Sequence, residues 1–259
     1  VMVMVVMPML SPLVGGELMI RFDWHSIFYL VAAISLTMLF AMQRALPETL
    51  KKQTPFTGVG SMLKGFVTLL SSRIFSAYAM NVAFVSVMFF SFIAAAPEVM
   101  VSVLNRPPNE YGYYFILVPS AFMAGNYVAR WLSTRFGVKR MITSGSWLSI
   151  TGISIALILH LSGLLHPLAL FMPIALTTFG NGISLPNAQA AAINEFPDMA
   201  GSASGLTGFL QMGFSAVAAQ LVALMFNGTV YPMLLLMLTA ATLSLVSFYI
   251  AQRHTDSSA

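Results

Sequence analysis

Few side chains in this sequence combine the type and the spacing that an active site needs. Cysteine is absent, which excludes thiolate nucleophiles and thiolate metal ligands. The four histidines fall at the ends of apolar blocks or in the tail, and none stands at ligand spacing from a carboxylate on a helix: His25, His160, His166 and His254. We therefore expect no metal ion, no cofactor and no enzymatic activity.

Two carboxylates have positions that suit the binding and release of a proton within a membrane. Glu17 and Glu98 each lie near the end of a long apolar block, and an intramembrane carboxylate is a functional candidate by default. A solvated carboxylate at a helix end is the alternative. No carboxylate falls in the middle of an apolar block, so any proton-linked role within this chain falls to these two residues.

Amide side chains inside apolar blocks are the main candidates for contacting a ligand. In lipid, a buried amide needs a hydrogen-bond partner, which is usually on another helix. The alternative is a central cavity in which aromatic and methionine side chains form adaptable walls. The residues that fit such a lining are Asn81, Phe84, Met88, Phe89, Met123, Asn126 and Gln211.

The elements that position these residues must be membrane helices. Of the 259 residues, 58% are hydrophobic and 8% are charged, and the mean hydropathy is +0.84. Soluble domains carry about 25% charged residues, so a soluble globular fold is excluded. The pI is near 9.5, but the basic residues lie between apolar blocks, so they indicate membrane orientation and not a nucleic acid partner.

Eight blocks have the length of about 20 apolar residues that a helix needs to cross a bilayer. They lack the alternation of barrel strands. The sequence therefore predicts an all-α polytopic protein of about eight transmembrane helices in a lipid bilayer. The predicted spans are Met2–Ile20, Ser26–Gln43, Ile74–Ala96, Tyr111–Trp131, Met141–Leu159, Pro167–Gln189, Ala200–Phe226 and Tyr231–Ala251. Small residues in the seventh span predict a close approach of helix backbones: Gly201, Gly205 and Gly208.

Lysine and arginine are distributed unevenly between the loops. With the first span starting inside, ten basic residues fall in inner segments and two, Arg21 and Arg106, fall in outer loops. The positive-inside rule then places both ends of this chain in the cytoplasm. The inner residues are Arg44, Lys51, Lys52, Lys64, Arg73, Arg130, Arg135, Lys139, Arg140 and Arg253.

One inner segment, residues 44–73, is long enough to divide the chain. Its apolar residues recur every three to four positions between Val59 and Leu70, which predicts an amphipathic helix on the membrane surface. A frayed extension of the next span is the alternative. Six spans form the half-unit of transporters built from 6+6 helices. The predicted parts are thus two spans in 1–43, the linker 44–73, a six-helix half in 74–251 and a cytoplasmic tail in 252–259.

The first two spans resemble part of the major facilitator superfamily of drug exporters. Ser11-Pro12-Leu13-Val14-Gly15-Gly16 resembles the antiporter motif of the fifth helix, whose key residues here are Pro12, Gly15 and Gly16. Met7 and Ser11 stand where that motif usually has glycines. Leu46-Pro47-Glu48-Thr49 resembles the end of the sixth helix.

The later spans carry further resemblances. The loop with Arg130, Arg135, Lys139 and Arg140 resembles the second copy of the superfamily's basic loop motif, with Thr134 in place of the acidic residue. Three segments are similar to the Bcr/CflA branch of drug:proton antiporters: Gly180–Ala190, Phe196-Pro197 and Ala200–Gly205.

The resemblance implies a twelve-helix fold of which this chain matches helices five to twelve, lacking the first four. It implies a bacterial inner-membrane exporter that moves lipophilic or cationic compounds against proton entry by alternating access. It also implies that spans one, three, four, six and seven line the cavity. We expect a truncated multidrug exporter. The alternatives are a sugar or metabolite exporter of the same fold and a membrane subunit without transport activity.

Overall fold

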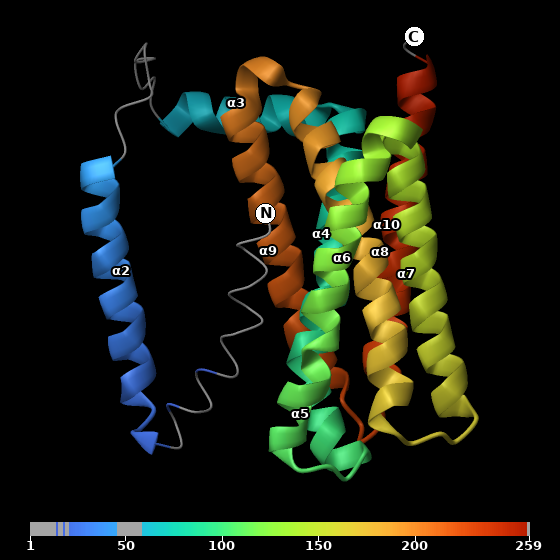
Figure 1. The fold of residues 1–259 in the computed structure, drawn as a ribbon. Coiled ribbons are helices and arrows are strands. Elements are labelled where there is room, and N and C mark those ends of the chain that lie inside the picture. Colours follow the sequence, from blue (N-terminus) through green and yellow to red (C-terminus); the bar gives the residue numbers. More distant parts are fainter. Residues whose placement is uncertain (1–13, 15–17, 19–20, 46–58, 258–259) are drawn as a thin grey trace.

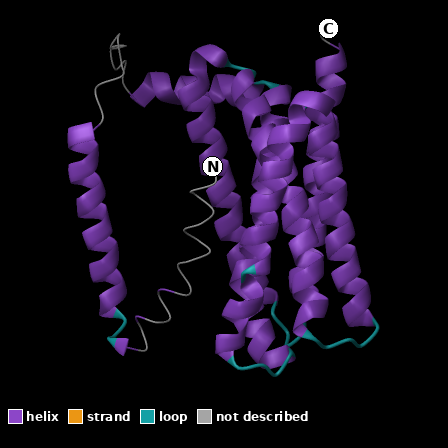
Figure 2. Ribbon diagram, viewed as in Figure 1, coloured by secondary structure: helices purple, strands orange, loops and turns teal. Residues whose placement is uncertain are grey.

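The computed structural model describes residues 14, 18, 21–45 and 59–257. Within these residues every regular element is a helix (Figure 2), which confirms the predicted all-α fold. The elements are α2 (His25–Ala45), α3 (Val59–Ser71), α4 (Arg73–Glu98), η1 (Val99–Val103), α5 (Pro108–Phe115), α6 (Leu117–Phe136), α7 (Val138–Leu161), α8 (Pro167–Asn194), η2 (Pro197–Met199), α9 (Ala200–Met225) and α10 (Tyr231–Ser257).

Six of the described helical stretches are long and apolar enough to cross a membrane. They are His25–Ala45, Arg73–Val103, Val138–Leu161, Pro167–Asn194, Pro197–Met225 and Tyr231–Arg253. The helix α6 is not among them, although it lies alongside the spans in the bundle (Figure 1). It corresponds to the predicted span Tyr111–Trp131, which the structure divides into α5 and α6. The predicted span Met2–Ile20 lies outside the described residues except for Val14 and Leu18.

The helices α4 and α8 organise the bundle. The most extensive packing joins α8 to α7 and α6, and α4 to α10 and α9. The larger of two apolar clusters is built around the edge-to-face pair Phe92–Phe171, with ring centroids 5.4 Å apart. The second cluster, around Phe75 and Phe248, lies toward the other ends of these helices and includes Leu69 of α3.

Glycines set the spacing around α8. A Cβ atom on Gly182 would lie 2.3 Å from the carbonyl oxygen of Phe122, and one on Gly180 would lie 2.4 Å from that of Gly145. Backbones of α8 therefore touch those of α6 and α7 directly. The close approach predicted for α9 is not found among the described residues, where nothing lies within 4 Å of the position that a Cβ would take on Gly201, Gly205 or Gly208.

The short helix α3 lies across the end of the bundle at which the C-terminus is found (Figure 1). Leu69 is fully buried and Phe66 packs beside it in the second cluster. Leu63 and Val67 point away from the bundle and are 55% and 64% exposed. The apolar residues of this segment thus divide between two faces of α3, one of which the described bundle leaves uncovered.

The helix α2 stands apart from the bundle (Figure 1), and none of its residues is buried. Its long apolar side chains are exposed, including Phe28 at 65% and Phe40 at 61%. In a membrane, lipid or other helices would cover such a surface.

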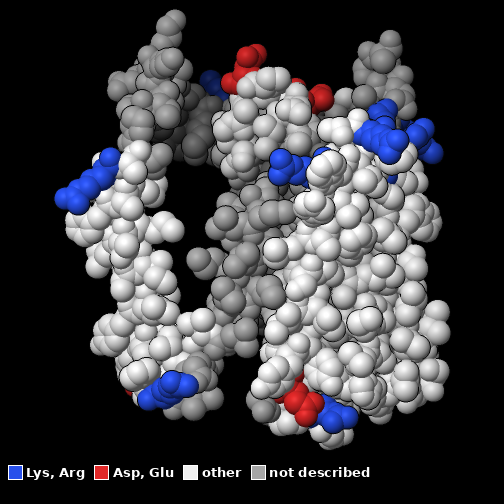
Figure 3. All heavy atoms as spheres, in the orientation of Figure 1, with Lys and Arg blue, Asp and Glu red and all other residues white. Residues whose placement is uncertain are grey.

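Charged side chains gather at the two ends of the helices and leave the middle apolar (Figure 3). One end, with α3 and the end of α10, carries most of the basic residues. The opposite end carries Arg21 and Arg106. The described basic residues of the first end are Arg44, Lys64, Arg73, Arg130, Arg135, Lys139, Arg140 and Arg253.

Candidate functional site

A pocket of about 350 Å³, lined by both polar and apolar side chains, lies between α6 and α8, toward the basic end of the bundle. Arg130 and Asn126 enter it from α6, and Asn187 enters it from α8. The pocket therefore joins a residue of the predicted cavity lining to one of the predicted basic loop. The full lining is Asn126, Tyr127, Ala129, Arg130, Ser133, Pro186 and Asn187.

The local sequence explains where the pocket forms. The two helices touch backbone to backbone at Gly125 and Gly182. One turn farther along α8, Pro186 has no N–H to donate to the carbonyl of residue 182, which interrupts the helix hydrogen bonds. The pocket opens at this interruption, where side chains replace the direct backbone contact.

The amides and the hydroxyl of the pocket are held by their own helices. Asn126 Nδ2 donates to the carbonyl of Phe122 at 3.0 Å, and Asn187 Nδ2 donates to that of Ile183 at 2.8 Å. Ser133 donates likewise to the residue four positions earlier. The side-chain orientations are thus fixed, and the amide oxygens of the two asparagines receive no donor from the described residues. Arg130 has no hydrogen bond or ion pair among those residues either.

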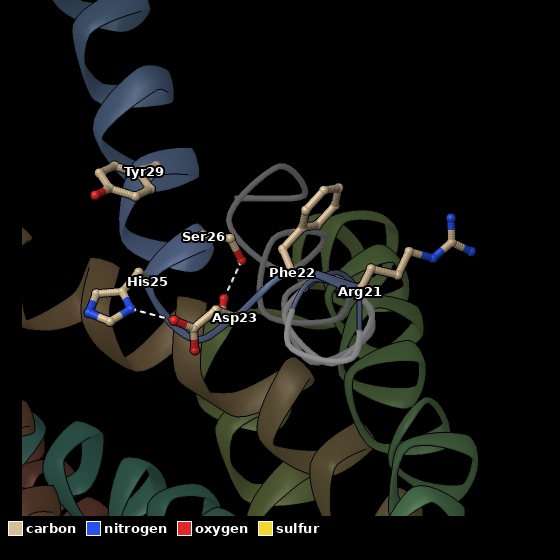
Figure 4. Close-up of a pocket in the computed structure, with 6 residues that line it drawn as sticks. All are labelled: Arg21, Phe22, Asp23, His25, Ser26 and Tyr29. Carbon is tan, nitrogen blue, oxygen red and sulfur yellow. Dashed lines mark hydrogen bonds and ion pairs between the residues drawn. The ribbon is translucent and has the colours of Figure 1, made fainter.

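A second, more open hollow of about 600 Å³ lies at the start of α2 and is lined by Arg21, Phe22, Asp23, His25, Ser26 and Tyr29 (Figure 4). Asp23 lies 2.6 Å from the Nδ1 atom of His25, and the main-chain carbonyl of Asp23 accepts a hydrogen bond from Ser26. These are local contacts at a helix start, and the side chains of Asp23 and His25 are more than half exposed. We assign this hollow no ligand, because its residues all come from one short segment.

Two of the predicted lining residues lie inside the bundle. Asn81 is fully buried, and its Nδ2 atom donates to both the carbonyl and the hydroxyl oxygen of Ser244 on α10 at 2.8 Å. Met88 is 1% exposed and belongs to the larger apolar cluster. Neither side chain lines the α6–α8 pocket, and the hydrogen bonds of Asn81 to Ser244 favour the structural interpretation of Asn81.

The remaining predicted lining residues are partly exposed. Phe84 and Phe89 on α4, Met123 on α6 and Gln211 on α9 are all half-buried. Phe84 packs edge-to-face on Phe214 of α9, with ring centroids 5.7 Å apart. Among the predicted lining residues, Asn126 lines the α6–α8 pocket and these four lie outside it.

Of the two predicted proton-linked residues, only Glu98 lies within the described residues. Glu98 is exposed at the end of α4 and accepts a hydrogen bond from the hydroxyl of Ser102. Glu17 lies outside the described residues, as do Pro12, Gly15 and Gly16 of the antiporter motif. In the described part of the chain every carboxylate is at or beyond a helix end.

The basic loop turns at Gly137, whose φ of +81° is strained for any other residue. Arg135, Lys139 and Arg140 are exposed around this turn between α6 and α7. Arg130 lies more than one turn back along α6 and belongs to the pocket instead. The predicted basic loop thus separates into an exposed turn and a pocket residue.

Sequence reasoning missed the polar contacts that join α7 to α8. Ser149 donates to Asn181 Oδ1 at 2.8 Å and to the carbonyl of Thr177 at 3.1 Å, and all three residues are buried. It also missed Ser133 and Asn187 as pocket residues. The available signal was the four-residue spacing of polar side chains along one face of α6, from Asn126 to Arg130.

Six helices long and apolar enough to cross a membrane, with charges gathered at their ends, define a multi-pass helical membrane protein. The chain belongs to the Major Facilitator Superfamily, whose sequence model matches residues 1–219. This confirms the predicted family, whose curated relatives include proteins named as transporters.

Curated relatives extend the comparison. The chain is 26% identical over 257 residues to the bicyclomycin resistance protein homolog of Haemophilus influenzae, covering 96% of this chain and 62% of that protein. It is 29% identical over 212 residues to the multidrug transporter MdfA of Escherichia coli O157:H7, covering 81% and 51%. It is 28% identical over 225 residues to multidrug resistance protein D of Escherichia coli K12, covering 85% and 55%. The similarity is therefore to drug transporters of the Bcr/CflA type, of whose length the chain spans 51% to 62%.

Proposed function

We propose that the complete protein exports lipophilic or cationic drug-like compounds in exchange for protons by alternating access. The single observation that carries this proposal is the similarity along 96% of the chain to a bicyclomycin resistance protein homolog. The geometry supports it, because the described residues leave the α9 side of the bundle uncovered, and half-buried side chains such as Phe84 and Gln211 line that side. A transporter of two helical halves binds its substrate between them, at such a face.

The proposal assigns roles to particular residues. Phe84, Phe89, Met123 and Gln211 form the adaptable wall that contacts the transported compound. Asn126 reaches the same compound from the α6–α8 side. Glu98 and Glu17 are the proton-linked candidates of this chain, and Pro12, Gly15 and Gly16 bend a helix that moves between states.

We also propose an inner-membrane location with the basic end in the cytoplasm. Eight described basic residues at one end of the helices and two at the other support this orientation. The helix α3 then lies on the cytoplasmic surface, where Leu63 and Val67 can enter the lipid interface.

The test is ethidium accumulation in bacteria that lack their own exporters and express the protein from its complete gene. Lower accumulation that is abolished by a protonophore is the expected result. Accumulation equal to that of cells with an empty vector, at confirmed protein abundance, would reject the export of cationic compounds. Efflux of labelled sugars alone would favour the metabolite exporter, and no flux of either kind would favour a membrane subunit without transport activity.

A further inference from the structure

We propose that the pocket between α6 and α8 binds the phosphate of a phospholipid headgroup, with phosphatidylglycerol favoured over phosphatidylcholine. The pocket shares Asn126 with the proposed contacts to the transported compound, and its other lining residues are not among those contacts. Lipid binding at this pocket does not depend on which compound the protein exports, because it is inferred from the lining of the pocket and from the position of the pocket in the bundle.

The positive charge of the pocket is unpaired. Arg130 is exposed, and no described residue gives it a hydrogen bond or a carboxylate. A guanidinium presents several N–H donors in a plane that matches two oxygens of a phosphate. Tyr127, also unbonded at its hydroxyl within the described residues, lines the same pocket. The pocket therefore offers donors suited to an oxyanion.

The same pocket offers two fixed acceptors. The side chains of Asn126 and Asn187 each donate an Nδ2 hydrogen to a carbonyl of their own helix. The Oδ1 atoms of Asn126 and Asn187 receive no hydrogen bond from the described residues. A preferred ligand therefore carries O–H or N–H groups beside its oxyanion. The glycerol hydroxyls of phosphatidylglycerol meet this need, whereas the choline group has no such donor.

The surroundings of the pocket identify the oxyanion as part of a lipid. Tyr127 and Trp131 are 52% and 64% exposed on α6, with ring centroids 6.3 Å apart. Paired exposed aromatic rings next to arginine are typical of the level at which membrane headgroups lie. The pocket is also at the basic end of the bundle, which attracts anionic lipid.

The test uses fluorescence of Trp131, because it follows Arg130 by one position in sequence and lies next to Tyr127. The protein is expressed from its complete gene with every other tryptophan, Trp24 and Trp147 included, replaced by phenylalanine. It is reconstituted in phosphatidylcholine vesicles that contain brominated phosphatidylglycerol or, in parallel, brominated phosphatidylcholine at equal mole fraction. Bromine quenches the fluorescence when the lipid occupies the neighbouring site.

We expect brominated phosphatidylglycerol to bind about fivefold more strongly, which is the selectivity that one basic residue near a membrane surface supplies. Arg130→Gln should lower this ratio, and the preference that remains is the part supplied by the two asparagine acceptors. Arg140→Gln removes the same charge at the same end but outside the pocket, and should leave the ratio unchanged.

Equal quenching by the two lipids in the parent protein would overturn the proposal without reference to any variant. An equal loss of selectivity in Arg130→Gln and Arg140→Gln would overturn it in favour of general surface charge. Excess inorganic phosphate should leave the quenching unaltered, and displacement of the lipid by phosphate would reassign the pocket to a free anion. Since the readout involves no transport, failure here leaves the ethidium result untouched.

Discussion

The Nδ2 atom of Asn81 on α4 donates hydrogen bonds to two oxygens of Ser244 on α10, although 163 positions separate the two residues in the sequence. Both residues are almost wholly buried, and the Oδ1 atom of Asn81 has no partner in the described structure. This polar contact joins the third predicted span to the last and closes the six-helix unit on itself.

The first prediction follows from that contact. Asn81→Ala removes both hydrogen bonds and is expected to destabilise the folded protein by about 1–2 kcal/mol. Thermal unfolding in a mild detergent measures the loss. Thr239→Ala on the exposed side of α10 is the control, since its hydroxyl bonds only within its own helix. Unchanged stability together with an altered range of exported compounds would contradict this structural role and support the prediction that Asn81 lines the cavity.

A second prediction contrasts two glycines. A Cβ atom on Gly125 would lie 2.2 Å from the carbonyl oxygen of Phe179, so Gly125→Ala should force α6 from α8 and cost about 1–3 kcal/mol. Gly205→Ala meets open space and should stabilise α9 by about 0.5–1 kcal/mol. Unfolding of the 259-residue chain in detergent compares them. Similar losses at both positions would show that contact with α8 is not what distinguishes Gly125.

The third prediction concerns Gln211, which is half-buried on α9 and has no side-chain partner in the described structure. In the complete protein, Gln211→Ala should change the relative export of different compounds while abundance stays similar. Gln220→Ala provides a matched control, because Gln220 is an exposed glutamine on the same helix. A drop in abundance with no change in relative export would assign Gln211 a structural role.

Orientation provides the fourth prediction. Reporter fusions placed after Gln53 and after Ser257 should both be active in the cytoplasm, whereas a fusion after Asn227 should be active outside. The basis is the uneven division of basic residues between the two ends of the helices. An external signal from either of the first two fusions would reverse the topology.

The sequence was sufficient to predict the helices but not their contacts. Apolar length located the spans, and the predicted span that begins at Pro167 coincides with the start of α8, where proline suits the first turn of a helix. The glycines that bring backbones together were missed, since Gly125 and Gly182 acquire their role only from the helix opposite. Gly201 and Gly205 have the four-residue spacing that is typical of close helix contacts, yet they face no neighbour among the described residues.

The candidate site was predictable only in part. Asn126 and Arg130 were both identified, but in separate roles, because one belongs to an apolar block and the other to a basic motif. Their common pocket depends on Pro186 and Asn187, which are about 60 positions away and come into contact through the α6–α8 packing. Asn81 was predicted to line a cavity, but in the structure this polar residue of an apolar block joins α4 to α10 by hydrogen bonds.

The difference between α8 and α9 bears on how this protein can change over evolutionary time. Backbone contacts at Gly145, Gly180 and Gly182 leave no room for a larger side chain, so selection must preserve those positions whatever the cargo. Exposed positions of α9 such as Phe209 and Met212 contact the described bundle little and can be replaced without shifting a neighbouring backbone. On the proposed function, a change in the range of exported compounds would therefore be expected to arise by substitutions along α9, while the glycines of α8 stay the same because they set the distance to the neighbouring helices.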